Sequence, residues 1–473
     1  MTADAGGNGE HVTHTKRVTA LTNDALLNRN VMVNLAAWAL PALAALVCIP
    51  ILARNMGPSR FGLLSLGWAA VGMFSLFDFG LGRALTRLVA ERLARGHEHD
   101  LADLIWAAGW LLLGLTAVVA AAGVWFAPMI VDRLLHVPMA LRGEAIGVVR
   151  LLSLGIPPLA HGVALRGVLE AGQRFPLAAR LRVPLGVATF AGPLLALPLG
   201  GDARVAVGTI VVARVAYWIA LFVVLRHIVP RLHVPRIPPF AIMHELVTVG
   251  GWITVSNIVS PVLVQADRVM VAIAFPIAAS GWYGVAIEVA TKQWLFTAAL
   301  QPVLFSAIAA ALKPAPERAV QLMERAAKVT MLVLFPAALV LAGFAQPLLR
   351  LWMGSAYAPQ AADALRWLAI AVFVNSLAQV PYAMLQGGVD ARASALLHLI
   401  ELPLYLSVLV YFTHRWGIPG VALAWLARMA FDAVAQWWAL RHQLPAARPA
   451  IWRVVRLAVP ATGILVAAAL LGA

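Results

Sequence analysis

Charged residues are scarce in this sequence. Only 12% of its 473 residues are Asp, Glu, Lys or Arg, whereas 62% are hydrophobic. Soluble domains carry about a quarter charged residues, so this composition excludes an ordinary soluble globular protein. The mean hydropathy is +0.85, and the hydrocarbon core of a bilayer is where so much apolar surface is stable. The sequence therefore predicts an integral membrane protein.

Cysteine is almost absent as well. Cys48 is the single cysteine, so the chain cannot form an internal disulfide, and a metal site built on paired cysteines is excluded. Cys48 lies inside an apolar run, where a free cysteine behaves as a small buried apolar residue.

Catalytic motifs are also missing. The chain has no phosphate-binding Gly-Lys loop, no HExxH and no GxSxG. The segments between apolar runs are short and leave no room for an active-site domain. We therefore expect no catalytic residue, no bound metal and no cofactor, and hence a protein that is not an enzyme. The net charge of +15 indicates membrane topology rather than nucleic-acid binding.

What the sequence contains is a series of long apolar runs. A helix needs about 20 apolar residues to cross a bilayer, and these runs are too long for barrel strands. They cover roughly 31–53, 61–82, 104–127, 146–165, 183–200, 205–226, 246–276, 279–311, 326–347, 364–386, 395–413, 418–440 and 454–472. The prediction is an all-α, polytopic membrane protein with 12 transmembrane helices and a 13th at the C-terminal end.

The basic residues predict the orientation. If the N-terminus is cytoplasmic, most of the 36 Lys and Arg residues fall in inside segments. The outside segments then hold only Arg54, Arg60, Arg133, Arg142, Arg204, Arg350 and Arg415. Cytoplasmic loops carry an excess of Lys and Arg, so the split favours a cytoplasmic N-terminus.

The chain divides at two polar stretches. Residues 1–28 are polar and lack the apolar core of a signal peptide, so we expect a disordered cytoplasmic tail. Residues 231–244 belong to a proline-rich basic stretch that predicts a cytoplasmic linker. The linker separates an N-terminal lobe of six helices (29–230) from a C-terminal lobe of six helices (245–440), and residues 441–473 form the extra helix.

Ionisable residues inside the spans are the first candidates for function, because each costs about 2.5–3.5 kcal/mol to insert. Glu288 and Lys292 are four residues apart on one helix face, which predicts an ion pair. Arg428 and Asp432 have the same spacing and receive the same interpretation. Asp267 is adjacent in sequence to another candidate, Arg268. Their side chains point about 100° apart, so at least one of them needs a partner elsewhere.

Short motifs in both halves resemble one known family. The first half contains Asn34, Ile49-Pro50-Ile51-Leu52, Arg54, Gly57, Phe61-Gly62 and Phe77-Asp78-Phe79-Gly80-Leu81 followed by Arg83 and Arg87. The second half contains Gly251-Trp252, Ser256-Asn257, Asp267-Arg268-Val269-Met270, Trp282-Tyr283 and Lys292. On these residues, over about 30–440, the chain resembles the polysaccharide flippases of the multidrug/oligosaccharidyl-lipid/polysaccharide exporter superfamily.

The resemblance implies two six-helix lobes around a central cavity lined by spans 1, 2, 7 and 8. It also implies a flippase that moves undecaprenyl-pyrophosphate-linked oligosaccharide across the bacterial inner (cytoplasmic) membrane by alternating access. The product would be O-antigen, capsule or exopolysaccharide. The implied partners are this lipid-linked oligosaccharide, the lipid bilayer, and a polysaccharide polymerase or chain-length regulator, with no nucleic acid.

Such a substrate predicts two kinds of binding residue. Phosphates bind arginine and lysine in a sheltered cavity, and the candidates are Arg83, Arg268, Lys292 and Arg214. Sugar hydroxyls bind amides, hydroxyls and aromatic faces, and the candidates are Asn34, Asn257, Gln265, Gln293, Trp68 and Tyr283. Asp78, Asp267 and Glu288 are candidates for tuning the cavity charge or binding a coupling cation.

Two other functions fit parts of the sequence. A cation-coupled multidrug exporter of the same superfamily would have a mainly acidic and aromatic cavity, which Arg268 and Lys292 oppose. A membrane-embedded glycosyltransferase or polymerase would carry a catalytic acidic residue in a sizeable loop, and the loops here are short. We rank the flippase first, the exporter second and the enzyme third.

Overall fold

The computed structural model describes residues 24–73, 78, 80–95, 100–172, 174–229, 231–311, 316–385 and 391–472. Some side chains in these ranges are not described, chiefly those of residues 24–38, 250–261 and 391–399 and several between 299 and 311. The described chain is helical throughout, apart from one isolated bridge between His136 and Pro276. The prediction of an all-α fold is therefore confirmed.

The N-terminal half of the chain forms the first group of helices. Its members are α2 (Asp24–Met56), α3 (Pro58–Met73), α4 (Leu81–Ala94), α5 (Leu101–Arg133), η3 (Met139–Leu141), α6 (Arg142–Ala171), α7 (Phe175–Ala191), η4 (Gly192–Leu199) and α8 (Ala203–Ile228). Helix α2 begins inside the segment that the sequence predicts as a tail. Packing of α6 against α5 and α8, and of α2 against α7, joins these helices into what we call the N-terminal group.

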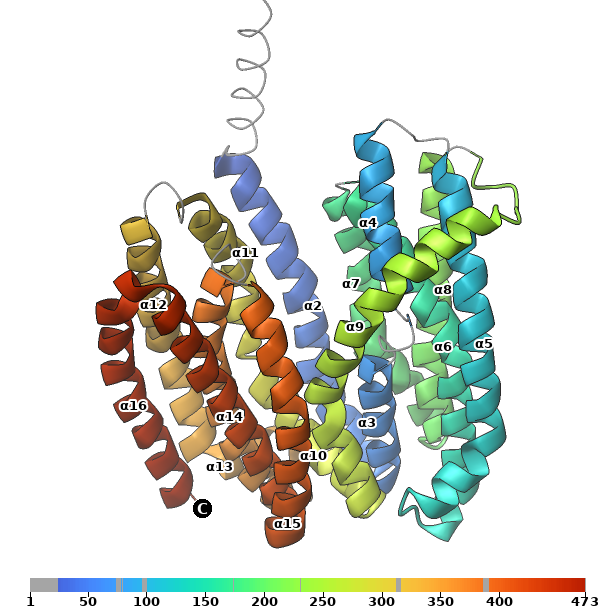
Figure 1. Ribbon diagram of the computed structural model, residues 1–473. Helices are drawn as coiled ribbons and strands as arrows, with labels where there is room; N and C mark the ends of the chain where they lie inside the picture. Colours follow the sequence, from blue (N-terminus) through green and yellow to red (C-terminus); the bar gives the residue numbers. More distant parts are fainter. Residues whose placement is uncertain are drawn as a thin grey trace, which may run out of the picture.

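The second half of the chain forms the C-terminal group. Its members are α9 (Phe240–Ala274), α10 (Ile277–Thr291), α11 (Trp294–Ala311), α12 (Pro316–Gly343), α13 (Ala345–Met353), α14 (Ala358–Met384), α15 (Ala391–Gln443), η6 (Pro445–Ala447) and α16 (Arg448–Leu471). Helix α14 packs against α10, α12 and α15, and α16 lies on α12 at the outside of the group (Figure 1).

Nine helical stretches in the described part of the chain are long and apolar enough to cross a membrane. One of them belongs to α15, which contains a bend. Gly417 has φ 65° and ψ −141°, a conformation that favours glycine, and it divides α15 into two arms. The apolar run 61–82 lies mainly in α3 and ends at the first two residues of α4, whereas the run 279–311 is divided between α10 and α11.

The buried apolar residues form three clusters. One is shared by both groups and includes Leu52 on α2, Phe61 on α3, Tyr283 on α10 and Trp425 on α15. The second belongs to α11, α12, α14, α15 and α16, and the third to α4–α9. The two groups therefore share one core near the ends where α2 finishes and α3 begins, and have separate cores elsewhere.

We call the end with the shared core the sealed end; it lies at the bottom of Figure 1. There α3 and α10 approach so closely that a Cβ on Gly62 would lie 2.0 Å from the carbonyl oxygen of Ile277. A Cβ on Gly284 would likewise lie 2.8 Å from Ser65 Oγ. Glycine at these two positions allows the helices to touch through their backbones.

Polar contacts reinforce the sealed end. The Tyr357 hydroxyl donates to the carbonyl of Ala53 at 3.0 Å, and Arg54 donates to the carbonyls of Trp352 and Met353 at 2.9 and 3.3 Å. Trp352 in turn donates its indole N–H to the carbonyl of Leu46 at 2.8 Å. All of these bonds join α2 to α13 or α14, so they hold the two groups together.

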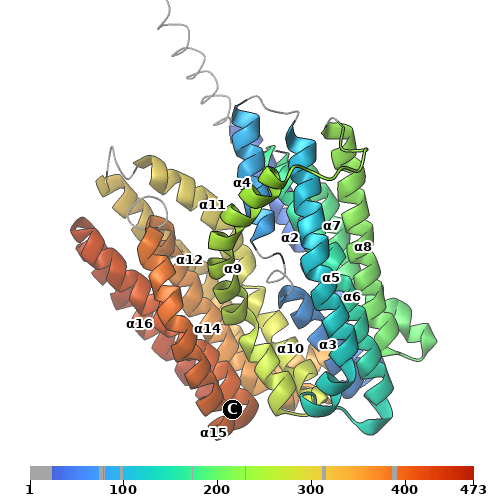
Figure 2. The same ribbon diagram turned by 45° about the vertical axis from the view of Figure 1, so that its right-hand side comes forward.

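The opposite end, which we call the far end, is connected differently. Described contacts between the groups there run through α9 and the segment before it, which lie across α4 and α5 (Figure 2). Arg92 forms an ion pair with Glu245 at 2.8 Å, and Arg236 forms one with Asp103 at 3.4 Å. Here α9 and the segment before it bridge the groups, whereas α2 and α3 meet several helices of the C-terminal group at the sealed end.

Candidate functional site

Each group contains a pair of short consecutive helices separated by a break in the α-helix. The chain leaves the α-helix between α3 and α4, where Gly80 has φ 70°, and between α10 and α11. At the second break, Lys292 and Gln293 donate their backbone N–H groups to residues three positions earlier, as in a 3₁₀ helix. Discontinuous helices at matching positions of two repeats are the usual location of a substrate site in a transporter.

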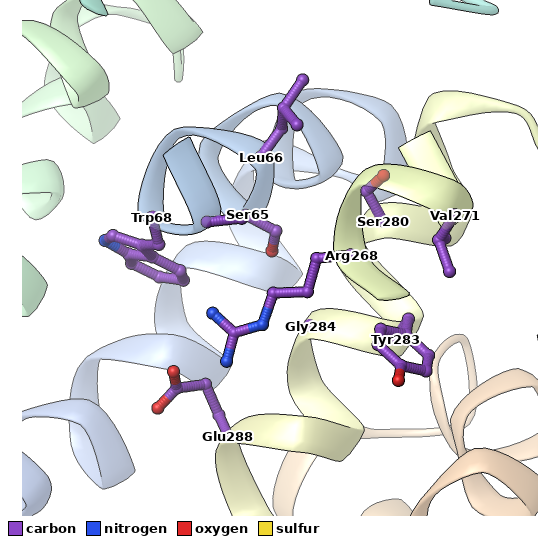
Figure 3. Close-up of a pocket in the computed structure, with 10 residues that line it drawn as sticks. Ser65, Leu66, Trp68, Arg268, Val271, Ser280, Tyr283, Gly284 and Glu288 are labelled. Carbon is purple, nitrogen blue, oxygen red and sulfur yellow. The ribbon is translucent and has the colours of Figure 1, made fainter. Parts of the chain in front are cut away.

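A small pocket lies beside these breaks, just inside the sealed end. It is lined by Ser65, Leu66, Trp68 and Ala69 on α3, Arg268 and Val271 on α9, and Ser280, Tyr283, Gly284 and Glu288 on α10. Figure 3 shows the Arg268 guanidinium extending into it, toward Trp68 and Glu288. The structure thus brings Trp68, Arg268, Tyr283 and Glu288 together from the two groups.

The two basic side chains in and beside this pocket, Lys292 and Arg268, differ in their partners. Lys292 Nζ lies 2.8 Å from Glu288 Oε2, which confirms the predicted ion pair. The same ammonium lies 5.7 Å from the centre of the Phe190 ring, at a cation–π distance. By contrast, Arg268 forms no ion pair with any described residue, and its Nε has no hydrogen-bond partner there. The carboxylates of Glu288 and Asp267 are close enough to act electrostatically on Arg268, but neither forms an ion pair with it, so its guanidinium can still donate hydrogen bonds to an anion.

Asp267 turns away from Arg268 into the C-terminal group. Its side chain is completely buried, and its Oδ2 accepts a 2.6 Å hydrogen bond from the hydroxyl of Tyr283. Asp267 thus has a partner other than Arg268, which agrees with the expectation from the 100° separation of neighbouring side chains on a helix. Tyr283 is 1% exposed, and its hydroxyl is committed to this bond.

A second cavity, of about 540 Å³, lies within the N-terminal group. Arg83, Arg87 and Arg166 line it together with Asp78 and Glu170. Asp78 Oδ1 accepts a 2.7 Å bond from the backbone N–H of Gly80, so it also stabilises the break before α4. Arg166 was missed as a candidate because its position predicts a loop, whereas α6 continues through it to Ala171.

Arg214 lies behind the small pocket. One of its terminal nitrogens is 3.5 Å from Thr189 Oγ1, and its Nε has no partner among the described residues. The carbonyl of Thr189 accepts the indole N–H of Trp68 at 3.1 Å. Arg214 is therefore linked to Trp68 of the small pocket through Thr189.

The amide candidates have separate surroundings. Gln265 is buried against the backbone of Gly72, so it lies between α9 and α3. Gln293 donates to the carbonyls of Ala290 and Ala369, which fixes the helix break against α14. The side chains of Asn34 and Asn257 lie outside the described residues.

The interpretation of Arg428 and Asp432 as an ion pair is wrong in its choice of partner. Arg428 Nε donates to Glu401 Oε1 at 2.7 Å, and a terminal nitrogen donates to the carbonyl of Leu263 at 2.9 Å. Asp432 instead accepts from Gln436 at 3.2 Å. Helical spacing cannot reveal the Glu401 contact, because that residue lies on the other arm of α15.

The third feature is an apolar groove of about 940 Å³ between α2 and α10–α12. Its walls include Leu43 and Leu46 on α2 and Val333 and Val340 on α12, four side chains that are all exposed at the surface. Its inner end reaches Glu288, Lys292 and Gln293. The groove thus connects the lipid-facing surface with the ionic residues of the small pocket.

Comparison with known proteins gives two kinds of match. Residues 27–315 match a family described as "Polysaccharide biosynthesis protein". A protein of Shigella flexneri whose provisional name is O-antigen transporter is 26% identical over 416 residues, which cover 87% of this chain and 96% of that protein.

The solved structures that match are more distant in sequence. An inward-facing multidrug resistance transporter of the MATE family, in the MOP superfamily, is 15% identical with a TM-score of 0.73, covering 88% of this chain and 98% of that one. The lipid II flippase MurJ in an inward closed conformation is 12% identical with a TM-score of 0.71, covering 93% and 98%. At such identities the likeness shows a shared fold.

Proposed function

The chain belongs to the polysaccharide biosynthesis protein family, and we propose that it is a flippase for undecaprenyl-pyrophosphate-linked oligosaccharide in the bacterial inner membrane. The relative from Shigella flexneri, with its provisional name of O-antigen transporter, supports this substrate. The product is O-antigen, capsule or exopolysaccharide, and a polymerase or chain-length regulator takes over the sugar chain afterwards.

The observation that carries the proposal is the position of Arg268. Its guanidinium lies between the two groups, next to the sealed end, without an ion pair among the described residues. An unpaired cation is costly away from water, so such a residue is retained where an anion or water meets it. A diphosphate supplies several oxygens that accept hydrogen bonds from a guanidinium, with a strength that neutral groups do not reach.

The remaining parts of the substrate match the other features. A polyprenyl chain is an apolar tail that must stay in lipid while its head crosses the membrane. The apolar groove between α2 and α12 offers such a route, since it ends at Lys292 beside the small pocket. The cavity with Arg83, Arg87 and Arg166 offers a second basic surface for the phosphates.

Alternating access follows from the two ends of the molecule. In the arrangement that we infer, six spans form each lobe, α16 is a thirteenth span, and the N-terminus is cytoplasmic. The sealed end then faces outward and the far end faces the cytoplasm. The head enters from the far end, the lobes rock about the bound head, and the sealed end opens.

A cation-coupled multidrug exporter is the alternative within the same fold. Its substrates are organic cations, which Arg83, Arg166 and Arg268 would repel. Drug accumulation in cells separates the two: loss of this chain leaves drug accumulation unchanged if the protein is a polysaccharide flippase, and raises it if the protein is an exporter.

The direct test is translocation of the lipid-linked oligosaccharide in proteoliposomes. Arg268→Ala should lower the rate about 10–100-fold, because a charge-assisted hydrogen bond contributes about 1.5–3 kcal/mol. Arg142→Ala is the matched control, since that arginine pairs with Asp132 in an exposed position. Normal rates for both Arg268→Ala and Lys292→Ala would contradict the phosphate site, and no translocation by the unmodified protein would contradict the function.

A further inference from the structure

A cavity of about 410 Å³ lies inside the C-terminal group, between α9, α11, α14 and α15. Its polar and aromatic lining consists of Trp294, Thr297, Gln301, Asn375, Gln379, Tyr382, Arg428 and Asp432. We call it the amide pocket, because three of these side chains are amides. None of the three was a candidate from the sequence.

The amides are held in a fixed network. Gln301 Nε2 donates to the side-chain oxygen and to the carbonyl of Gln379, at 2.8 and 2.9 Å. Gln379 Nε2 lies 3.5 Å from Asn375 Oδ1, which also accepts the indole N–H of Trp294 at 3.2 Å. Asn375, Gln379 and Tyr382 share one face of α14, since they are four and seven residues apart. The network therefore presents oriented amides and aromatic rings to the same cavity.

The charges of the amide pocket do not suit a phosphate. Its one arginine, Arg428, is bound by the carboxylate of Glu401 and the carbonyl of Leu263. Glu401 is 2% exposed, so this pair is buried and compensated. Asp432, which accepts a hydrogen bond from Gln436, adds a carboxylate to the lining. Neutral hydroxyl groups, in contrast, can donate to a carboxylate and both donate to and accept from an amide.

The amide pocket lies within electrostatic range of the basic cavity of the N-terminal group. Tyr382, which lines the amide pocket, is close enough to Arg83 for the guanidinium to act electrostatically on its hydroxyl. Arg83 belongs to the cavity with Arg87 and Arg166. One molecule between the groups would therefore meet arginines on one side and uncharged amides and aromatic rings on the other.

We propose that the amide pocket binds the sugars of the transported lipid, while its phosphates are held by Arg268 and the arginines of the N-terminal group. This inference rests on the proposed function and adds an orientation of the head within the molecule. Sugars combine hydroxyl groups with apolar ring faces, which pair with amides and aromatic rings respectively. A site that hydrogen-bonds substrate hydroxyls also discriminates strongly against a substrate without them.

The test compares two lipids in proteoliposomes: undecaprenyl pyrophosphate carrying the full oligosaccharide, and the same lipid carrying one sugar. Gln379→Met keeps the length of the side chain and removes its hydrogen bonds. We expect about tenfold slower translocation of the oligosaccharide lipid, the effect of losing one to two hydrogen bonds, and less than about twofold for the one-sugar lipid. Arg268→Ala should slow both lipids.

Two further variants guard against a simple loss of folding. Ser376→Ala is the control on the same helix, because its hydroxyl bonds only the carbonyl of Val372 and lies outside the amide pocket. Gln301→Met removes the donor that positions Gln379. It should also slow the oligosaccharide lipid selectively, but by a smaller factor than Gln379→Met. If Gln379→Met does not fold, the result for Gln301→Met tests the sugar site in its place.

The outcomes separate this inference from the proposed function. Selective loss for the oligosaccharide lipid supports the sugar site. Equal effects on both lipids, or no effect on either, would overturn the sugar site while leaving the flippase intact. If the unmodified protein moves neither lipid, the proposed function itself fails.

Discussion

The sealed end and the far end of this protein are built from different contacts. At the sealed end, backbone approaches at Gly62 and Gly284 and a shared apolar core join the two groups. At the far end, α9 bridges them through the buried Leu246 and through partly exposed ion pairs such as Arg92 with Glu245. Close packing without gaps is sensitive to single atoms, whereas partly exposed ion pairs contribute little. The sealed end should therefore control the balance between conformations.

The largest effect is expected from Gly62→Val. Its Cβ would lie 2.0 Å from the carbonyl oxygen of Ile277, so the sealed form could persist only after a backbone shift. Overpacking costs about 1–3 kcal/mol, which would lower the ratio of sealed to opened form about 5–150-fold. Spin labels on Met139 and Leu351, both 83% exposed and on opposite groups, should report a longer distance. An unchanged distance would show that α3 and α10 do not form the seal.

A smaller effect is expected from Tyr357→Phe. This variant removes the hydroxyl that donates to the carbonyl of Ala53, and leaves the ring packed against Phe61 at 5.8 Å. One hydrogen bond contributes about 1 kcal/mol, or about fivefold in the sealed population. The same pair of spin labels measures this change in population. A change in the label distance as large as that caused by Gly62→Val would contradict the expected order of effects.

The smallest effect is expected at the far end. Arg92→Ala removes the ion pair with Glu245, in which the two side chains are 16% and 36% exposed. Partly exposed pairs contribute about 0–1 kcal/mol, so both the spin-label distances and the translocation rate should stay within about twofold. A large change in either would mean that the far end also holds the groups together.

Much of the fold was predictable from the sequence, because apolar runs long enough to cross a bilayer must form helices to satisfy their backbone hydrogen bonds there. The family resemblance was confirmed, and with it a membrane transporter of polysaccharide biosynthesis rather than an enzyme. The helix breaks were not predictable in the same way. The break at Lys292 and Gln293 contains no proline or glycine, so it depends on tertiary contacts such as the bond from Gln293 to Ala369.

The candidate site was predictable only where local spacing decides the contact. The pair of Glu288 with Lys292 follows from the helix repeat, whereas Arg428 finds Glu401 across the bend in α15. The amide pocket could not be recognised from local spacing, because its side chains come from four helices that are distant in sequence. Asn375 and Gln379, four residues apart in an otherwise apolar run, were a partial signal of it.

Exchange between sealed and opened forms is the central claim, and a reversible crosslink tests it most directly. A Cβ on Gly284 would lie 3.1 Å from that of Ser65, close to the separation of about 3.5–4.5 Å found in disulfides. The variant Ser65→Cys with Gly284→Cys, in a Cys48→Ala background, should translocate no lipid-linked oligosaccharide when oxidised and should recover its own reduced rate on reduction. Oxidation should leave the rate of each single cysteine variant unchanged. Translocation at the same rate in the oxidised and reduced states would contradict the account.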